Sequence, residues 1–266
     1  MLIKSNNGVY YMQFPNLVEF PELSHGVFTR REGHSPAPFD SLNLGFGLGD
    51  DEALVRQNRR RVSQILGNGA LVFAHQVHGT HVLVVGPDGA GRARPEARAQ
   101  PGRQTPTGDA LVTRVRAQML TIQVADCQAV LMYDPVQRVV ANVHAGWRSS
   151  IGNIIGKTIA RMQKDYGCKP GHLVAGIGPS LGPCCGEFVN YVREIPREFW
   201  HHKFGSHHFN FWAITREQLG QAGVAPANVH TSEICTRCNP GVFFSYRREK
   251  TTGRFAAIIG LKPANA

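Results

Sequence analysis

The fold is decided by one stretch, Met119-Leu-Thr-Ile-Gln-Val-Ala-Asp-Cys-Gln-Ala-Val-Leu-Met-Tyr133, which runs on through Asp134-Pro135 to His144. It contains three short apolar runs, at residues 119–124, 129–133 and 138–144, separated by Ala-Asp-Cys and by an Asp-Pro turn. Nearly continuous apolar runs of this length are typical of strands that are buried on both faces. The stretch therefore predicts the centre of a layered sheet protein.

Strand and helix patterns alternate on both sides of this stretch, and no long linker divides the chain. Apolar residues at helical spacing predict helices over residues 52–66, 149–166, 188–195 and 213–222. β-rich runs predict further strands over residues 71–74, 82–85, 110–115, 173–177, 242–246 and 255–261. This order favours an α/β protein of the α+β type, a single domain over residues 1–266 with layered mixed β-sheets flanked by helices, and not a doubly wound fold.

Composition is that of an ordered globular protein, with 42% hydrophobic and 18% charged residues in a chain of 266. The apolar runs are too short to span a bilayer, and residues 1–15 lack the apolar segment of a secretory signal. We therefore expect a cytoplasmic protein with no membrane partner. The sequence contains no GxGxxG, Walker or GxSxG motif, which excludes several common enzyme classes.

The formal net charge of +10 favours anionic partners such as phosphate and phosphorylated metabolites. The charge is not organised as in a nucleic-acid reader, because no recognition-helix, zinc-finger or RNP pattern is present. Part of it lies in an Arg- and Pro-rich segment at Gly91 to Thr107, which is interpreted as a solvated, mobile loop. Nucleic acid is therefore not the expected partner.

Six cysteines stand at positions 127, 168, 184, 185, 235 and 238, and without a secretory signal we expect reduced thiols. Cys184 and Cys185 are adjacent and cannot pair with each other without strain. Cys235 and Cys238 have CxxC spacing, yet no second CxxC or His pair completes a structural zinc site. The pair is interpreted as packing and turn chemistry, with metal binding or redox cycling as the alternative.

Three residues form a candidate metal-ligand set: His78 before a glycine, Cys127 at the end of an apolar run, and His144 at the end of another. Two imidazoles and one thiol suit Zn²⁺ or copper. Three protein ligands leave a coordination position open, as a catalytic metal requires. On an extended strand His75 and His81 would point away from His78, so they are interpreted as ordinary structural or surface histidines.

The chain resembles the bacterial YfiH/YlmD-like laccase-domain family, whose members are described as polyphenol oxidases and as purine nucleoside phosphorylases. The resemblance covers nearly the whole chain. It is carried by motifs in the family's order: Phe28-Thr-Arg30, Ser41-Leu-Asn-Leu-Gly45, Gln76-Val-His-Gly79, Gly108-Asp-Ala110, Ala125-Asp-Cys127, His144-Ala-Gly-Trp-Arg148, Gly178-Pro179, Gly182-Pro-Cys-Cys185, Cys235-Thr236, Phe243-Phe-Ser-Tyr-Arg-Arg248 and Thr251-Thr-Gly-Arg254. The segment at residues 91–107 is longer than usual for the family.

The resemblance implies a catalytic zinc ion on His78, Cys127 and His144, with copper as the alternative metal. It also implies phosphorolysis of adenosine, inosine, guanosine and methylthioadenosine, together with adenosine deamination. Purine nucleosides and phosphate are the implied partners, and several oligomeric states remain compatible with the sequence.

Given that site, Asp109 is the candidate catalytic carboxylate, because Gly108-Asp-Ala precedes a strand, although a turn-capping role is the alternative. Guanidinium groups bind phosphate oxygens in pairs, which makes arginines the candidate phosphate ligands. The candidate substrate-binding residues are Arg30, Arg148 and Arg247, with Asn43 for the sugar or base. Ion pairing for the arginines and a tight turn for Asn43 are the alternatives.

Three other functions remain open on the sequence. A copper-dependent polyphenol oxidase would use the same soft ligands, but multicopper chemistry needs more histidines than this trio supplies. The histidines at 201, 202, 207 and 208 form what is interpreted as an exposed polar segment. A metal-free hydrolase would pair Cys127 as nucleophile with His144 as base. A nucleic-acid binder would explain the charge but not the ligand motifs.

Overall fold

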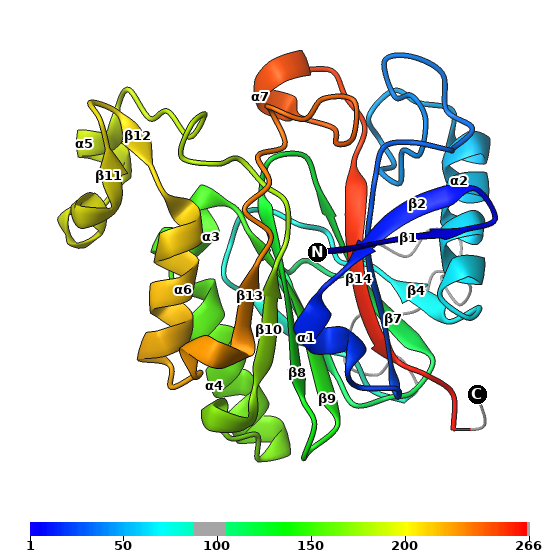
Figure 1. Ribbon diagram of the computed structural model, residues 1–266, viewed down its shortest axis with the longest axis horizontal. Coiled ribbons are helices and arrows are strands. Elements are labelled where there is room, and N and C mark those ends of the chain that lie inside the picture. The colour runs from blue at the N-terminus through cyan, green and yellow to red at the C-terminus, as the bar shows by residue number, and fades with distance from the viewer. Residues whose placement is uncertain (88–104, 265–266) are drawn as a thin grey trace.

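The computed structural model describes residues 1–87 and 105–264 (Figure 1). Its strands form two six-stranded sheets and a two-stranded ribbon. The first sheet has the order β1 (Leu2–Asn6), β2 (Val9–Gln13), β3 (Leu23–Phe28), β14 (Phe255–Leu261), β7 (Gln118–Val124) and β4 (Ala70–Val72). The second has the order β13 (Val229–Thr231), β10 (Val174–Ile177), β8 (Gln128–Asp134), β9 (Val139–Ala145), β6 (Ala110–Thr113) and β5 (Val82–Val84). The ribbon pairs β11 (Lys203–Phe204) with β12 (His208–Phe209).

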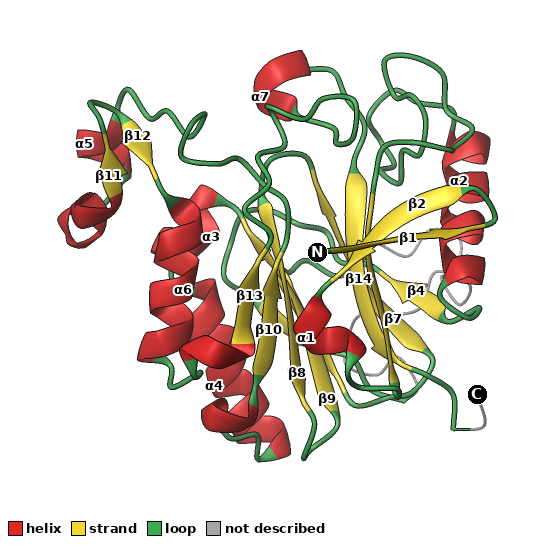
Figure 2. Cartoon of the chain, in the orientation of Figure 1, coloured by secondary structure: helices red, strands yellow, loops and turns green. Residues whose placement is uncertain are grey.

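The α-helices of the described residues are α1 (Pro15–Val18), α2 (Glu52–Ile65), α3 (Trp147–Ile151), α4 (Ile154–Tyr166), α5 (Tyr191–Glu194), α6 (Phe211–Gln221) and α7 (Tyr246–Glu249). Within the same residues, three 3₁₀ helices span Pro170–His172, Arg197–His202 and Pro226–Asn228. Figure 2 shows α2 outside the first sheet, and α4 and α6 outside the second. Parallel pairs, such as β4 with β7, occur beside antiparallel pairs in both sheets. The expected α/β fold with layered mixed sheets is therefore confirmed. The single domain over residues 1–266 stays a prediction.

Three apolar layers hold the sheets and helices together, and they explain the unbroken apolar runs of the sequence. The alternate residues Ala257, Ile259 and Leu261 of β14 enter the core between the two sheets. Ala256 and Ile258, on the opposite face, pack in the layer that contains Val62 and Ile65 of α2. β8 likewise divides its side chains between the central core and the layer under α4 and α6. Strands buried on both faces need no polar alternation.

Two of the expected elements differ from the structure. The helix expected over residues 149–166 is two helices, α3 and α4, because Asn153 adopts a left-handed conformation (φ 53°) and its side chain caps α4 at the Gly156 N–H. The strand expected over residues 242–246 is a turn, in which the Asn239 carbonyl accepts the N–H of Val242 and of Phe243. The Ser245 side chain then accepts the Arg248 N–H and starts α7.

Other expected elements are shorter than predicted. The helix expected over residues 188–195 is only α5, and the strands around residues 71–74 and 110–115 end earlier than expected. No helix within residues 1–87 and 105–264 is long and apolar enough to cross a bilayer. Most of the segment at residues 91–107 lies outside the described residues.

Candidate active site

One edge of the second sheet gathers four chain segments, and the strand register explains why. Because β8 and β9 are antiparallel with Gln128 opposite Ala145, Cys127 at the start of β8 lies beside the end of β9, where His144 stands. β6 runs antiparallel to β9, and the Asp109 carbonyl just before β6 accepts the His144 N–H at 2.7 Å. β5 is parallel to β6, so the segment that leads into β5 carries His78 to the same edge.

The three predicted ligands meet at this edge. One donor atom from each of His78, Cys127 and His144 can be chosen so that all three lie within 4.8 Å of one another. The two imidazole rings stand edge to face, with their centroids 4.8 Å apart. Gly146 permits this approach, because a Cβ there would lie 2.3 Å from His78 Nδ1 and 3.3 Å from Cys127 Sγ.

Asp109 forms hydrogen bonds to two of the three candidate ligands, His78 and His144. Its fully buried carboxylate accepts the backbone N–H groups of Val77, His78 and Gly79, the last two at 2.8 and 2.7 Å. It also lies 2.8 Å from Nδ1 of His144. Burial by itself would raise the pKa of Asp109, but the hydrogen bonds from His144 and from the backbone lower it below its usual value. Asp109 is therefore an anion that orients His144 and fixes the left-handed turn at His78 (φ 59°).

Cys127 and His144 form an ionic pair. Burial would raise the pKa of the Cys127 thiol, but the adjacent His144, and to a smaller extent His78, lower it to about 6. Burial would lower the pKa of His144, but Cys127 and the Asp109 carboxylate raise it to about 9. At neutral pH this arrangement favours a thiolate next to an imidazolium. A thiolate is the form of cysteine that binds metals.

The cluster opens into a cavity of about 790 Å³. Its cationic lining residues are Arg247, Lys250 and Arg254, and its aromatic lining residues are Phe46, Trp147, Phe188, Phe211 and Tyr246. Trp147 and Phe188 meet edge to face at 5.9 Å between ring centroids. Cations and aromatic rings in one cavity suit a ligand that is both anionic and planar.

Of the four residues expected to bind substrate, only Arg247 lines this cavity. One of its guanidinium nitrogens donates to the Glu187 carbonyl at 2.9 Å, and the group lies above the Phe188 ring. Arg148 does not line the cavity, and its exposed side chain stacks on Trp147 instead, with the guanidinium carbon 4.3 Å from the ring centroid.

Arg30 and Asn43 do not line the cavity either, and their side chains form hydrogen bonds within the protein interior. Arg30 is buried and donates to Glu249 at 2.9 Å and to the carbonyls of Asp40 and Pro240. Asn43 is fully buried, and its side-chain oxygen accepts the N–H groups of Gly45 and Arg254. These contacts correspond to the alternative roles considered from the sequence, ion pairing for Arg30 and a tight turn for Asn43. Asn43 thereby fixes the backbone of Arg254, which does line the cavity.

Arg254 and Lys250 were not among the expected site residues. Burial lowers the pKa of Arg254, while the nearby Cys127 and Asp126 act in the opposite direction. The sequence does contain a signal for these residues, since Arg247, Lys250 and Arg254 lie close together in one short stretch of the chain. The aromatic wall has no such signal, because its members come from segments far apart in the chain.

The segment before β5 is not an extended strand, so the expected alternation of its histidines is wrong. His78 adopts a left-handed conformation, which breaks the alternation of an extended strand, and His75 lines the cavity together with His78. His201, His202 and Glu217 form a separate cluster, with both imidazoles bonded to the carboxylate. His201 is exposed as expected, whereas the His202 side chain is only 13% exposed.

A family model described as "Multi-copper polyphenol oxidoreductase laccase" matches residues 24–262. The chain belongs to this family. Among curated relatives, this laccase-domain chain is 34% identical over 248 residues to purine nucleoside phosphorylase YlmD of Geobacillus stearothermophilus, covering 88% of this chain and 89% of that protein. It is 33% identical over 266 residues to a purine nucleoside phosphorylase of Deinococcus radiodurans, covering 96% and 94%.

Solved structures of the laccase-domain family share the fold. The crystal structure of YlmD from Geobacillus stearothermophilus superposes with a TM-score of 0.85 at 31% identity, covering 98% of both chains. That of the hypothetical protein YfiH from Bacillus licheniformis superposes with a TM-score of 0.84 at 28% identity, covering 96% of both. The resemblance to the YfiH/YlmD-like family is therefore confirmed.

The donor set in this laccase-domain chain fits a metal ion. For tetrahedral Zn²⁺ with Zn–N near 2.0 Å and Zn–S near 2.3 Å, ligand atoms lie about 3.5 Å apart. The donors of His78, Cys127 and His144 lie within 4.8 Å of one another, and the thiol has a lowered pKa. The second nitrogen of His144 is held by a carboxylate, which is the usual outer partner of a metal-binding histidine.

Proposed function

We propose that this chain is a zinc-dependent purine nucleoside phosphorylase with adenosine, inosine, guanosine and methylthioadenosine as substrates. The observation that carries the proposal is the position of the His78, Cys127 and His144 cluster in a cavity that also offers three cations and an aromatic wall. The names of the relatives support the same reaction. Adenosine deamination is proposed as a second activity of the same cavity.

The cavity residues divide between the two ends of the substrate. In phosphorolysis a phosphate oxygen bonds to the ribose C1′ while the C1′–N9 bond breaks and its electron pair leaves with the purine. We assign phosphate binding to Arg247 and Arg254, because guanidinium groups bind phosphate oxygens through paired hydrogen bonds. Phe188 and Trp147 are assigned to the purine, which stacks on aromatic faces.

We assign metal binding to His78, Cys127 and His144. A zinc ion bound there would supply a Lewis acid to the reacting atoms and, for deamination, a means of activating water at neutral pH. We assign Asp109 to positioning, since its buried carboxylate is engaged by three backbone N–H groups and His144 and does not line the cavity. A proton shuttle to the substrate, the role considered from the sequence, does not suit that position.

A metal-free Cys-His hydrolase is the second candidate function. It is favoured by one observation, the lowered pKa of Cys127 beside the raised pKa of His144. A copper-dependent phenol oxidase is the third, and the description of the family model supports it. The separate cluster at His201 and His202 lies outside the cavity lining, so it does not add histidines to the trio.

Reconstitution distinguishes the three functions. Protein stripped of metal is reloaded with zinc or with copper, and adenine release from adenosine is measured at fixed phosphate. We expect activity to rise with zinc content and to be lost in Cys127→Ala, whereas Cys168→Ala, a buried cysteine away from the cavity, retains it. Full hydrolytic activity in the stripped protein would favour the Cys-His function, and phenol oxidation only after copper loading would favour the oxidase.

A further inference from the structure

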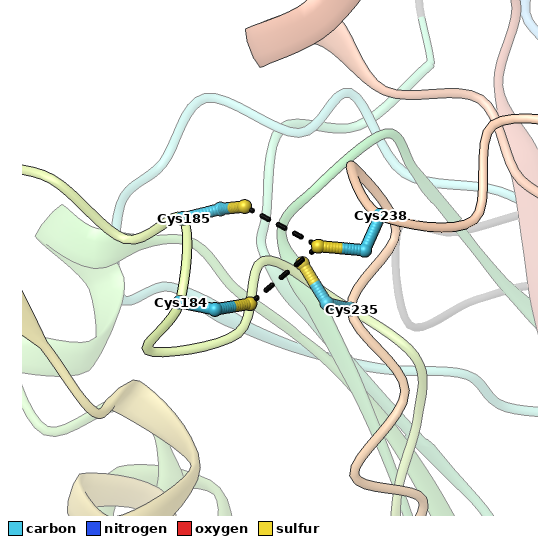
Figure 3. A group of neighbouring side chains, drawn as sticks. All are labelled: Cys184, Cys185, Cys235 and Cys238. Atoms are coloured by element: carbon cyan, nitrogen blue, oxygen red, sulfur yellow. Dashed lines mark hydrogen bonds between the residues drawn. The ribbon is translucent and has the colours of Figure 1, made fainter.

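We propose that Cys184, Cys185, Cys235 and Cys238 bind a second metal ion, a structural Zn²⁺ coordinated by four thiolates. The four side chains come from two loops that lie side by side, and their sulfur atoms converge on one point (Figure 3). None of the four is a ligand in the cluster at His78, Cys127 and His144. The proposal therefore does not depend on the proposed function.

The sulfur positions match a tetrahedral zinc site. All four Sγ atoms lie within 4.8 Å of one another, with Cys238 3.6 Å from Cys184 and 3.5 Å from Cys185. In a tetrahedron with Zn–S bonds near 2.3 Å, neighbouring sulfur atoms are about 3.8 Å apart. One disulfide would need only two of these sulfurs, at about 2.05 Å. Convergence of all four is what a metal site requires.

Two hydrogen-bond donors, one from the backbone and one from a side chain, lie beside the cluster. The Gly182 N–H donates to Cys235 Sγ at 3.3 Å. The guanidinium of Arg237 interacts with Cys185 and can offset the negative charge of four thiolates around one Zn²⁺.

Backbone hydrogen bonds join the two loops that carry the cysteines. Ser180 forms a bridge with Cys235, in which the Ser180 N–H donates to the Ile234 carbonyl and the Thr236 N–H to the Ser180 carbonyl. Two of the four residues, Cys184 and Cys238, are exposed, so a metal ion can reach the cluster from solvent. Four protein ligands leave no open position, which is the pattern of a structural site.

This site would fix one wall of the large cavity. The Cys184–Cys185 loop continues into Phe188, which lines the cavity. From the Cys235 loop, the Thr236 hydroxyl donates to the Asp126 carboxylate at 2.7 Å, directly before Cys127. A metal ion between the two loops would therefore tie the aromatic wall to the backbone that presents Cys127.

The sequence suggested only half of this site. The Cys235–Cys238 spacing was interpreted as packing and turn chemistry, because no second CxxC or His pair follows. The second pair is the adjacent Cys184–Cys185, which the fold places against it (Figure 3).

Metal content tests the proposal directly. Full-length protein purified under reducing conditions is analysed by mass spectrometry for zinc per chain, as wild type, Cys127→Ala, Cys238→Ser and Cys168→Ala. We expect about two zinc ions in wild type and in Cys168→Ala, and about one in each of the other two. Cys127→Ala leaves the four-cysteine cluster untouched, so its remaining zinc reports on that cluster even if Cys238→Ser fails to fold.

Cobalt replacement identifies the ligands. In Cys127→Ala loaded with Co²⁺, we expect the strong thiolate-to-metal absorption of a four-sulfur site, and we expect it to be lost when Cys184→Ser is added. A Cys127→Ala protein that binds no metal, or a bound cobalt without four-thiolate absorption, would overturn the proposal. A disulfide among the four cysteines in freshly purified, reduced protein would overturn it in favour of a redox pair.

Failure of this proposal and failure of the proposed function are separable. A protein with zinc in the four-cysteine site and no phosphorolysis would contradict the function alone. Phosphorolysis that depends on zinc at Cys127, in a protein with no metal at Cys235 and Cys238, would contradict the structural site alone.

Discussion

The Asp109 carboxylate lies 2.8 Å from Nδ1 of His144 and also accepts the N–H groups of His78 and Gly79. The buried Asp109 carboxylate thus orients His144 through its imidazole ring and His78 through its backbone N–H. It also raises the pKa of His144 and so contributes to the charge state of Cys127. The candidate site depends on this carboxylate, although it does not touch the cavity.

Replacing Asp109 should therefore weaken metal binding without removing a ligand. We expect Asp109→Asn to lower zinc affinity at the His78, Cys127 and His144 cluster by about 10- to 100-fold. Competition with a chromophoric chelator measures this change. Glu52→Gln is the matched control, because Glu52 is 64% exposed and pairs with Arg56 on the surface of α2. Equal affinity in Asp109→Asn and in wild type would show that the carboxylate does not support the ligands.

Alkylation of the metal-free protein should report the Cys127–His144 pair. Because His144 lowers the pKa of Cys127 to about 6, the reactive thiolate is present above pH 6 and is lost as the pH falls through that value. We expect His144→Gln to move the midpoint up toward the ordinary thiol value. Peptide mass spectrometry after a short iodoacetamide pulse follows Cys127 separately. Cys168 serves as an internal control, since burial raises its pKa to about 12.

Zinc should protect Cys127 in the same experiment. A wild-type midpoint near that of an ordinary thiol would contradict the ionic pair. Unchanged alkylation after zinc loading would contradict metal binding at Cys127.

His25 should make stability fall in mild acid. Burial lowers the pKa of His25 to about 4, and its Nε2 accepts the Phe14 N–H at 3.0 Å. In the unfolded chain this imidazole binds a proton below its ordinary pKa of 6.5, while in the folded chain it does so only below a pKa of about 4. The free energy of unfolding should therefore fall by about 3 kcal/mol from this residue between pH 6.5 and pH 4.

Urea unfolding across this range, in wild type and His25→Gln, isolates the contribution. Glutamine retains an acceptor for Phe14 but does not titrate, so the variant should show a shallower dependence on pH. The same slope in both proteins would mean that His25 is not held neutral by the fold.

Arg247 should act on phosphate. We expect Arg247→Gln to raise the KM for phosphate about tenfold or more, since a charged hydrogen bond contributes about 1.5 kcal/mol or more. The KM for the nucleoside should change less. Arg248→Gln is the control, because Arg248 is an exposed neighbour that does not line the cavity. Equal phosphate KM values in the two variants would remove Arg247 from the proposed phosphate site.

Much of the fold could be predicted from the sequence because its central strands are buried on both faces. β14 was expected over residues 255–261 and is Phe255–Leu261. The break at Asn153 could not be predicted from periodicity, because the apolar stripe continues through it. The turn at residues 242–246 could not be predicted either, because Phe243 and Phe244 are fully buried, as in a core strand, although they are not in a strand.

The candidate metal ligands could be predicted because residue type and neighbouring sequence were enough to single them out. The ligand residues stood out by type and by position, His78 before a glycine and Cys127 and His144 at the ends of apolar runs, and the strand register brings them together. The roles of Asp109 and Arg30 depend on tertiary contacts, with His144 in one case and Glu249 in the other. The four-cysteine cluster depends on two loops 53 residues apart in sequence, which no spacing rule connects.

Phosphorus NMR of the reaction with adenosine is the sharpest test of phosphorolysis at the Cys127 site. Protein of measured zinc content is incubated with adenosine and phosphate, and the spectrum is followed with adenine release. We predict that ribose 1-phosphate appears in proportion to adenine with wild type and with Cys168→Ala, and not with Cys127→Ala. Adenine formed at the same rate without phosphate, and with no ribose 1-phosphate, would contradict phosphorolysis at this site.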